Sequence, residues 1–198
     1  FLLGQAYEKL QEYRKAIGAF EAAQRYGIPR ERLSKRLVSL HYRFALESFE
    51  QRKYTAAIRS FEQVIKLEPG NAEARYSVGL CYSGLKNTEA ARRAFEAAAA
   101  ADPAYAKPHK ALGDLFRQAR LHEQAKSAYQ KALELDSTYT GAYGGLAQIH
   151  VEQDEIVAAV SLLVRATRID PRYGEGFILL GTFLTHLERP EEAVGALA

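Results

Sequence analysis

The residues that could perform chemistry are few, and their spacing does not complete a catalytic site. Ser83 and Lys86 have the Ser-x-x-Lys spacing of a nucleophilic site, but they fall at a predicted turn with no acid or oxyanion-stabilising feature nearby. Gly79 to Gly84 has the glycine spacing of a phosphate-binding loop, yet Leu85 and Lys86 replace its Gly-Lys-Ser/Thr ending and no strand precedes it. We attribute both matches to chance.

Histidine and cysteine do not indicate a metal or redox site. The five histidines are dispersed, and no pair has the spacing of metal ligands. His41 and His109 lie in equivalent positions of the repeat described below, where a large aromatic residue usually packs. The single Cys81 cannot form an internal disulfide, and we expect it to be a buried core thiol.

Adjacent carboxylates have a structural explanation. Asp154-Glu155 and Glu191-Glu192 lie near predicted helix starts, where negative charge complements the helix dipole. The sequence therefore predicts no enzyme activity, no cofactor and no metal site.

A regular repeat of about 34 residues runs through the chain, and it predicts an array of identical supersecondary units. One copy holds Leu112, Gly113, Phe116, Ala125, Tyr129 and Ala132. The copy before it holds Val78, Gly79, Tyr82, Ala91, Phe95, Ala98 and Pro103. Later copies hold Leu146, Ala147, Ala159, Leu163, Ala166 and Pro171, then Leu180, Gly181 and Ala193, and an earlier copy holds Phe44, Ala45, Ala57, Phe61, Val64 and Pro69.

Apolar residues within each unit recur at helical spacing in two stretches, separated by a short polar turn such as 118–123. Proline ends the second stretch, as at Asp102-Pro103 and Asp170-Pro171. We expect an all-α protein of antiparallel helix pairs in one array, with units at about 1–30, 38–71, 72–105, 106–139, 140–173 and 174–198. Residues 31–37 are additional, and they predict a first helix lengthened by about two turns.

Glycine recurs in the middle of the predicted first helices, at Gly79, Gly113 and Gly181. Glycine there costs about 1 kcal/mol relative to alanine. Its recurrence in register indicates that the facing helix approaches closely, and Ala45 and Ala147 fill the same position with the next smallest residue.

This pattern of Leu-Gly, an aromatic residue, then Ala, Tyr/Phe, Ala and Pro resembles the tetratricopeptide repeat family over essentially the whole chain. Departures are Ser48 and His150 in the first aromatic position and Ser137 in the proline position. The resemblance implies a right-handed superhelical α-solenoid. Its first helices would line a concave groove that receives a peptide or helix of a partner.

Groove-facing residues should recur once in every repeat. The candidate partner-binding set is Tyr42, Arg43, Leu46, Phe49, Tyr76, Leu80, Lys107, Lys110, Asp114, Arg117, Gly145 and Gln148. Gly141, Gly144 and Gly145 are expected to leave backbone exposed for a ligand. The alternative is that the aromatic residues pack against neighbouring helices and that the glycines permit tight stacking.

Two known groove chemistries of the family are missing. The carboxylate clamp that holds chaperone C-terminal tails needs Lys and Asn, then Asn, then Lys and Arg on successive first helices, and no three visible units supply them. The asparagine ladder of Ser/Thr glycosyltransferase arrays is also absent, because its positions hold Arg43, Ser77, Ala111, Gly145 and Leu179.

Positive charge is concentrated in the N-terminal third. Residues 1–71 hold 13 Lys/Arg against 8 Asp/Glu, whereas residues 72–198 hold 14 against 16. The excess includes a candidate basic patch of Arg30, Arg32, Lys35 and Arg36, with Arg25 and Arg43 nearby. The patch is either a solvated helix face or a docking site for an acidic partner. The net charge of +3 and the lack of regularly placed base-reading side chains do not favour RNA.

The function that follows is a non-catalytic scaffold that binds a segment of another protein. The alternative is the recognition arm of a larger enzyme, or of an assembly or secretion machine, because the chain is expected to be cut from a longer array. Self-association through apolar array ends is a further outcome. No stretch predicts a membrane span or a leader, so the compartment stays open, with the cytoplasm as the default.

Overall fold

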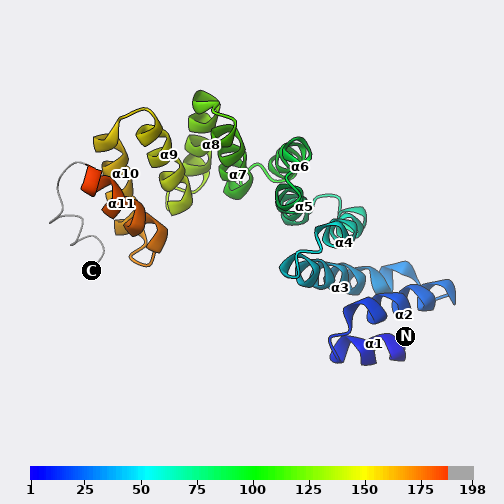
Figure 1. Ribbon diagram of the computed structural model, residues 1–198. Coiled ribbons are helices and arrows are strands. Elements are labelled where there is room, and N and C mark those ends of the chain that lie inside the picture. The colour runs from blue at the N-terminus through cyan, green and yellow to red at the C-terminus, as the bar shows by residue number, and fades with distance from the viewer. Residues whose placement is uncertain (187–198) are drawn as a thin grey trace. The chain divides into compact units, whose positions relative to one another are not determined.

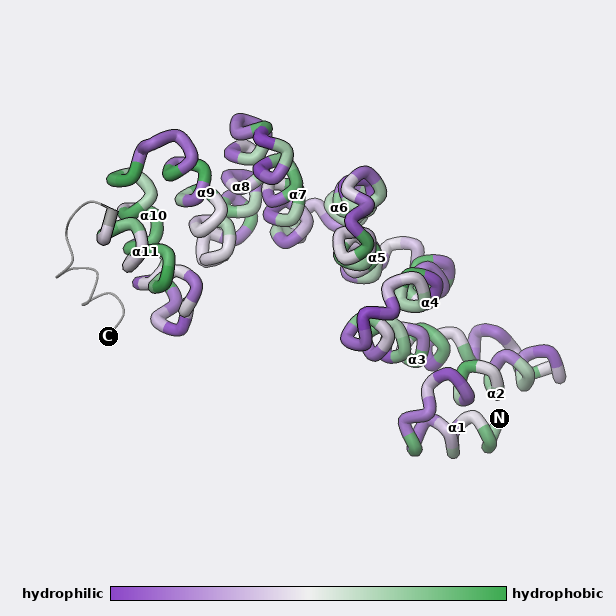
Figure 2. Tube along the Cα trace, in the orientation of Figure 1, coloured by the Kyte–Doolittle hydropathy of each residue, from purple (hydrophilic) through white to green (hydrophobic). Residues whose placement is uncertain are grey.

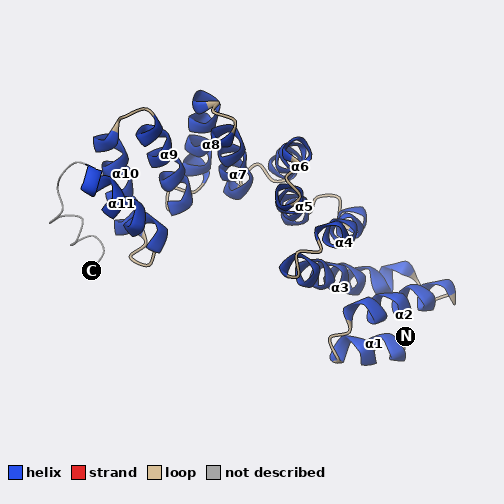
Figure 3. Ribbon diagram, in the orientation of Figure 1, coloured by secondary structure: helices blue, strands red, loops and turns tan. Residues whose placement is uncertain are grey.

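The computed structural model describes residues 1–186, and within them every regular element is a helix, as the sequence predicts (Figure 3). Two compact units divide the chain at Pro103 and Ala104. Unit 1 contains α1 (Leu2–Lys9), α2 (Tyr13–Arg25), α3 (Arg30–Glu50), α4 (Tyr54–Leu67), α5 (Ala72–Gly84) and α6 (Thr88–Ala101). Unit 2 contains α7 (Ala106–Gln118), α8 (His122–Leu135), α9 (Thr140–Glu152), α10 (Ile156–Ile169) and α11 (Gly174–His186) (Figure 1). Ala193 and the pair Glu191-Glu192 lie outside the described residues.

Successive helices pack as hairpins. The pairs α1–α2, α3–α4, α5–α6, α7–α8 and α9–α10 are in contact, and the first helix of each pair is odd-numbered. Figure 2 shows the turn between α9 and α10 as hydrophilic, between helices that carry hydrophobic stretches. This alternation follows because the turn stays in water while one stripe of each helix is buried.

In the hairpins α1–α2, α5–α6 and α7–α8, a large aromatic side chain of the second helix lies over a glycine of the first helix. Phe95 is 1% exposed and Tyr129 is 0% exposed. A Cβ atom added at Gly79 would lie 2.4 Å from the Phe95 ring, and one at Gly113 would lie 2.6 Å from the Tyr129 ring. The expectation that these glycines admit the facing helix is therefore confirmed.

Gly79→Ala is expected to lower the free energy of unfolding, although alanine is the better helix former. Overpacking against Phe95 costs about 1–3 kcal/mol, which exceeds the roughly 1 kcal/mol gained in helix propensity. Gly18 in α2 is the matched control, because a Cβ there meets nothing within 4 Å, and Gly18→Ala is expected to stabilise the chain. Thermal unfolding followed by circular dichroism compares the two variants, and an equally stable Gly79→Ala protein would contradict this packing.

The turns inside the hairpins share one backbone geometry. Gln11, Arg52, Lys86, Arg120 and Asp154 all have positive φ, between 57° and 63°. At Lys86 the amide donates to the Ser83 carbonyl, and the next amide, of Asn87, donates to the Tyr82 carbonyl. This is the Schellman pattern that closes a helix, here with residues other than glycine in the left-handed position.

Helix α3 is the longest helix within residues 1–186, with 21 residues, and residues 31–37 lie inside it. Its early leucines Leu33, Leu37 and Leu40 share a core with α2, around Phe20. Its later Ala45 shares a second core with α4 and α5. One continuous helix therefore contributes to two neighbouring cores.

Candidate protein-binding surfaces

First helices of unit 2 lie beside one another, because α7 contacts α9 and α9 contacts α11. Their outward positions form a surface that we call the first-helix face of unit 2. Its side chains are Lys107, Lys110, Asp114, Arg117, Gln148 and Ile178. Lys107 is exposed, and Ile178 is 65% exposed although it is apolar.

The charges of this face are largely paired with one another. Lys110 Nζ lies 2.8 Å from the Asp114 carboxylate, and the buried Tyr129 hydroxyl donates to the same carboxylate at 2.8 Å. Arg117 of α7 forms an ion pair with Glu152 of α9 at 3.0 Å. Asp114 and Arg117 therefore help to hold neighbouring helices together, whereas the Lys110–Asp114 pair lies within α7. Lys107 of this face forms no ion pair with any residue in 1–186.

The expectation of exposed glycine backbone is wrong for Gly144 and Gly145. Both residues are buried. A Cβ atom at Gly145 would lie 2.3 Å from the Tyr129 ring, and one at Gly144 would lie 2.3 Å from the Tyr173 hydroxyl. Tyrosine side chains cover this backbone, so the glycines permit tight stacking.

Aromatic residues predicted for the groove wall in unit 1 are half-buried and packed against rings of the second helices. Tyr42 lies 5.4 Å from Phe61 between ring centroids, and Tyr76 lies 5.5 Å from Phe95. Phe49 similarly contacts Tyr54, at 5.6 Å. Burial, and then the Glu73 carboxylate, raises the pKa of Tyr42 to about 12. These rings belong mainly to the hairpin cores.

Two other predicted residues of unit 1 are exposed to solvent. They are Arg43 and Leu46, which is 41% exposed, whereas Leu80 is half-buried. We define the first-helix face of unit 1 by the outward residues of α1, α3 and α5, which are Leu2, Gln5, Arg36, Arg43, Leu46 and Leu80.

The predicted basic patch occupies the first half of α3. Arg30, Arg32 and Lys35 are exposed, and Arg36 is half-buried. Arg36 Nε lies 3.3 Å from a carboxylate oxygen of Glu8. Its guanidinium also lies over the Phe20 ring, 5.4 Å from the centroid.

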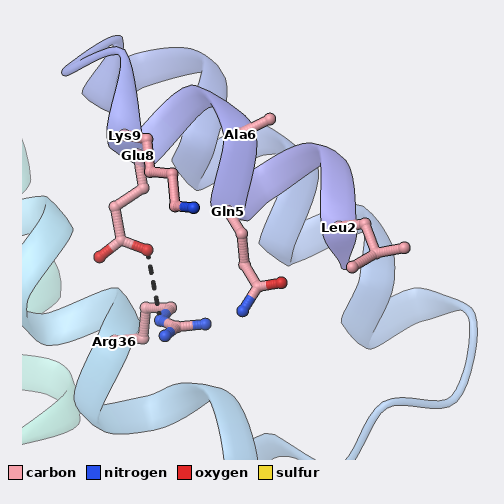
Figure 4. A pocket seen from close by; sticks show the side chains of 6 residues that line it. All are labelled: Leu2, Gln5, Ala6, Glu8, Lys9 and Arg36. Carbon is pink, nitrogen blue, oxygen red and sulfur yellow. Dashed lines mark ion pairs between the residues drawn. The ribbon is translucent and has the colours of Figure 1, made fainter.

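A pocket of about 560 Å³ opens between α1 and α3 at this point. It is lined by Leu2, Gln5, Ala6, Glu8, Lys9 and Arg36 (Figure 4). Sequence reasoning missed its α1 residues. Gln5 precedes Leu46 by one repeat and the seven additional residues. Gln5 could therefore have been predicted by counting back from Leu46 by one repeat and allowing for the insertion.

Two other pockets, of about 490 and 560 Å³, lie in single hairpins. Tyr82, Glu89 and Arg93 line the first. The residues in the same positions one repeat later, Phe116, Glu123 and Ser127, line the second. Because equivalent positions produce both openings, we attribute them to the packing of the repeat.

Burial changes the ionisation of two residues that were considered for chemistry, Cys81 and His41. Burial raises the pKa of the Cys81 thiol to about 11, which disfavours the thiolate, and it lowers the pKa of His41. Lys86 occupies the left-handed turn position after α5. Among residues 1–186, no three His, Cys, Asp or Glu side chains gather as metal ligands.

Sequence comparison decides the family. Models of the tetratricopeptide repeat match residues 1–26, 42–106 and 116–175, which together cover most of the chain. The chain belongs to the tetratricopeptide repeat family. No curated protein sequence is significantly similar to this tetratricopeptide protein.

Solved structures share the fold of this tetratricopeptide array at low sequence identity. MamA from Desulfovibrio magneticus is 14% identical with a TM-score of 0.64, and the match covers 81% of this chain and 90% of that one. PilF from Pseudomonas aeruginosa is 12% identical with a TM-score of 0.73, over 83% and 76% of the two chains. YrrB, described as a tetratricopeptide protein with an unusual peptide-binding site, is 21% identical with a TM-score of 0.56, over 79% and 81%. In the part of the array that is described, no helix is long and apolar enough to cross a membrane.

Proposed function

We propose that this tetratricopeptide array is a non-catalytic scaffold whose first-helix faces bind a peptide or helical segment of another protein. The observation that supports the proposal most directly is the exposure of Ile178, at 65%. Ile178 occupies the same repeat position as Tyr42, Tyr76 and Lys110, so an apolar side chain points to solvent where the family places ligand-facing residues.

Both faces offer a similar mixture of groups. Unit 1 presents Leu46 beside Arg43, and unit 2 presents Ile178 with Lys107. Apolar anchors contribute most of the energy of an interface, and surrounding polar groups set its orientation. The Arg117–Glu152 ion pair joins α7 to α9 and so helps to give such a ligand a preformed surface.

Binding is expected to weaken by at least about fivefold in Ile178→Asp, because burying an aspartate against an apolar ligand costs about 1–3 kcal/mol. The ligand is a peptide that is selected from a random display library for binding to the intact chain. Its Kd is measured by fluorescence anisotropy.

The matched control is Val157→Asp. Val157 is 70% exposed but lies on the second helix α10, so this variant should keep its affinity within about twofold. The corresponding test in unit 1 is Leu46→Asp. A library that yields no peptide sensitive to Ile178→Asp or Leu46→Asp would contradict the proposal.

A further inference from the structure

The lengthened helix α3 carries a stripe of arginines along its exposed side. At about 100° per residue, Arg32, Arg36 and Arg43 lie within about 40° of one another around the helix axis. The leucines at 33, 37 and 40 are buried on another side. Leu46 continues the arginine stripe by one more turn and is 41% exposed.

Basic residues outnumber acidic ones along this part of α3. Residues 30–46 contain five Lys or Arg and a single acid, Glu31. Arg36 pairs with Glu8, whereas Arg32 and Arg43 form no ion pair with any residue in 1–186. The two arginines without an ion pair, Arg32 and Arg43, therefore attract a ligand with complementary charge.

Two of the arginines are held in place by aromatic rings. The Arg32 guanidinium lies 5.5 Å from the Phe1 ring centroid, and that of Arg36 lies 5.7 Å from Phe1 and 5.4 Å from Phe20. Stacking uses the face of the guanidinium and leaves N–H groups at its edge for a carboxylate. The rings therefore reduce the entropy that these side chains lose when they bind.

The pocket between α1 and α3 extends this surface. Gln5 and Glu8 lie on the side of α1 that faces Arg36 (Figure 4). Lys9 adds a second cation to the lining, and Leu2, 79% exposed, adds an apolar edge. The surface thus offers cations in the middle with apolar side chains at both ends, Leu2 and Leu46.

We propose that the α3 arginine stripe, Arg32, Arg36 and Arg43, binds an acidic, extended segment of a partner protein. The inference rests on the proposed function. It adds the charge of the ligand, its extended conformation and the spacing of its acidic residues. Arg32 and Arg36 are separated by a rise of about 6 Å, and Arg36 and Arg43 by about 10.5 Å. An extended chain advances about 3.3 Å per residue, so acidic residues at i, i+2 and i+5 match the three guanidinium groups.

A protein ligand fits this surface better than single-stranded RNA. RNA recognition uses exposed aromatic side chains as stacking platforms. Here the rings of Phe1 and Phe20 are engaged by arginine, and Tyr42 packs against Phe61. The apolar ends of the stripe suit leucine-like side chains that flank the acids.

The test uses the full chain and a fluorescein-labelled peptide with glutamates at i, i+2 and i+5 and a leucine at each end. A glutamine peptide of the same sequence and a peptide with the same glutamates placed consecutively are its controls. We expect the matched peptide to bind at least tenfold more tightly than the glutamine peptide. Anisotropy titrations at two salt concentrations give the affinities and their salt dependence.

Protein variants test the location. Arg32→Gln/Arg43→Gln should weaken binding of the matched peptide about tenfold, because two solvent-exposed ion pairs with the peptide are lost. Arg59→Gln/Lys66→Gln removes the same charge from exposed positions of α4 and should change the affinity less than twofold. If loss of the Arg32 stacking unfolds the double variant, Arg43→Gln alone provides the test. Arg43 has no ring contact among the described residues, and this single variant should still weaken binding.

Several outcomes overturn the inference. If the glutamine peptide binds as tightly as the matched peptide, charge does not determine binding. If the α4 variant loses as much affinity as the α3 double variant, α3 is not the binding site. If the peptide with consecutive glutamates binds as tightly as the matched peptide, the proposed spacing is wrong. If a single-stranded uridine oligonucleotide binds more tightly than the matched peptide at the same salt concentration, RNA is the ligand. If the acidic peptide does not bind but library peptides remain sensitive to Leu46→Asp or Ile178→Asp, the proposed function stands and this inference fails.

Discussion

Replacing Phe95 with alanine is expected to lower the free energy of unfolding by about 3–5 kcal/mol, in the transition that includes α5 and α6. The ring is 1% exposed, and it packs against the Gly79 backbone and the ring of Tyr76. Because Gly79 has no side chain that could move into the space, the cavity persists. Urea unfolding of the full chain, followed by far-UV circular dichroism, measures the loss.

Tyr26→Ala is the control for Phe95→Ala. Tyr26 is 90% exposed, and removing an exposed ring should change the free energy of unfolding by less than about 0.5 kcal/mol. A Phe95→Ala protein that is as stable as the Tyr26→Ala protein would show that the second-helix aromatic residues are not the centres of the hairpin cores.

Stability is expected to fall between about pH 10 and pH 12 because of tyrosines that are buried or half-buried. Burial, and then nearby carboxylates, raises the pKa of Tyr42 and of Tyr173 to about 12, and the same causes raise the pKa of Tyr129. An unfolded tyrosine has a pKa of about 10. In this window the unfolded chain has lost protons that the folded chain still holds, so unfolding becomes easier as pH rises. Each such group contributes a slope of up to about 1.4 kcal/mol per pH unit.

Phenylalanine variants separate this effect from general alkaline damage. Tyr42→Phe and Tyr173→Phe should each flatten the dependence of unfolding free energy on pH, measured by urea unfolding at pH 9, 10 and 11. Tyr26→Phe removes an exposed hydroxyl and should leave the slope unchanged. An unaltered slope in Tyr42→Phe and Tyr173→Phe would rule out their ionisation as the cause.

Periodicity predicts the packing of this chain well because the same contacts recur in each repeat. Gly79 and Phe95 have the same separation along the chain as Gly113 and Tyr129, and each pair meets in the structure. The exposure of Gly144 and Gly145 in α9 was predicted incorrectly. Tyr173 covers Gly144 from the loop between α10 and α11, and the reach of a loop side chain does not follow from helical spacing.

Charge pairing was only partly visible in the sequence. Lys110 and Asp114 are four residues apart on one helix, so their ion pair could be anticipated. Arg117 and Glu152 meet only because α7 and α9 lie side by side. The pairing of these residues changes their interpretation, since side chains expected to contact a ligand also stabilise the scaffold.

The length of α3 has a consequence for how such an array tolerates change. Seven residues advance a helix by about 10.5 Å, and their rotation about the helix axis is only about 20° short of two full turns. A duplication or insertion of this size preserves the phase of the hydrophobic stripe, whereas one of five residues would rotate it by more than a quarter turn. Selection can therefore lengthen a first helix in steps of two turns, acquiring new outward-facing side chains without redesigning the interior.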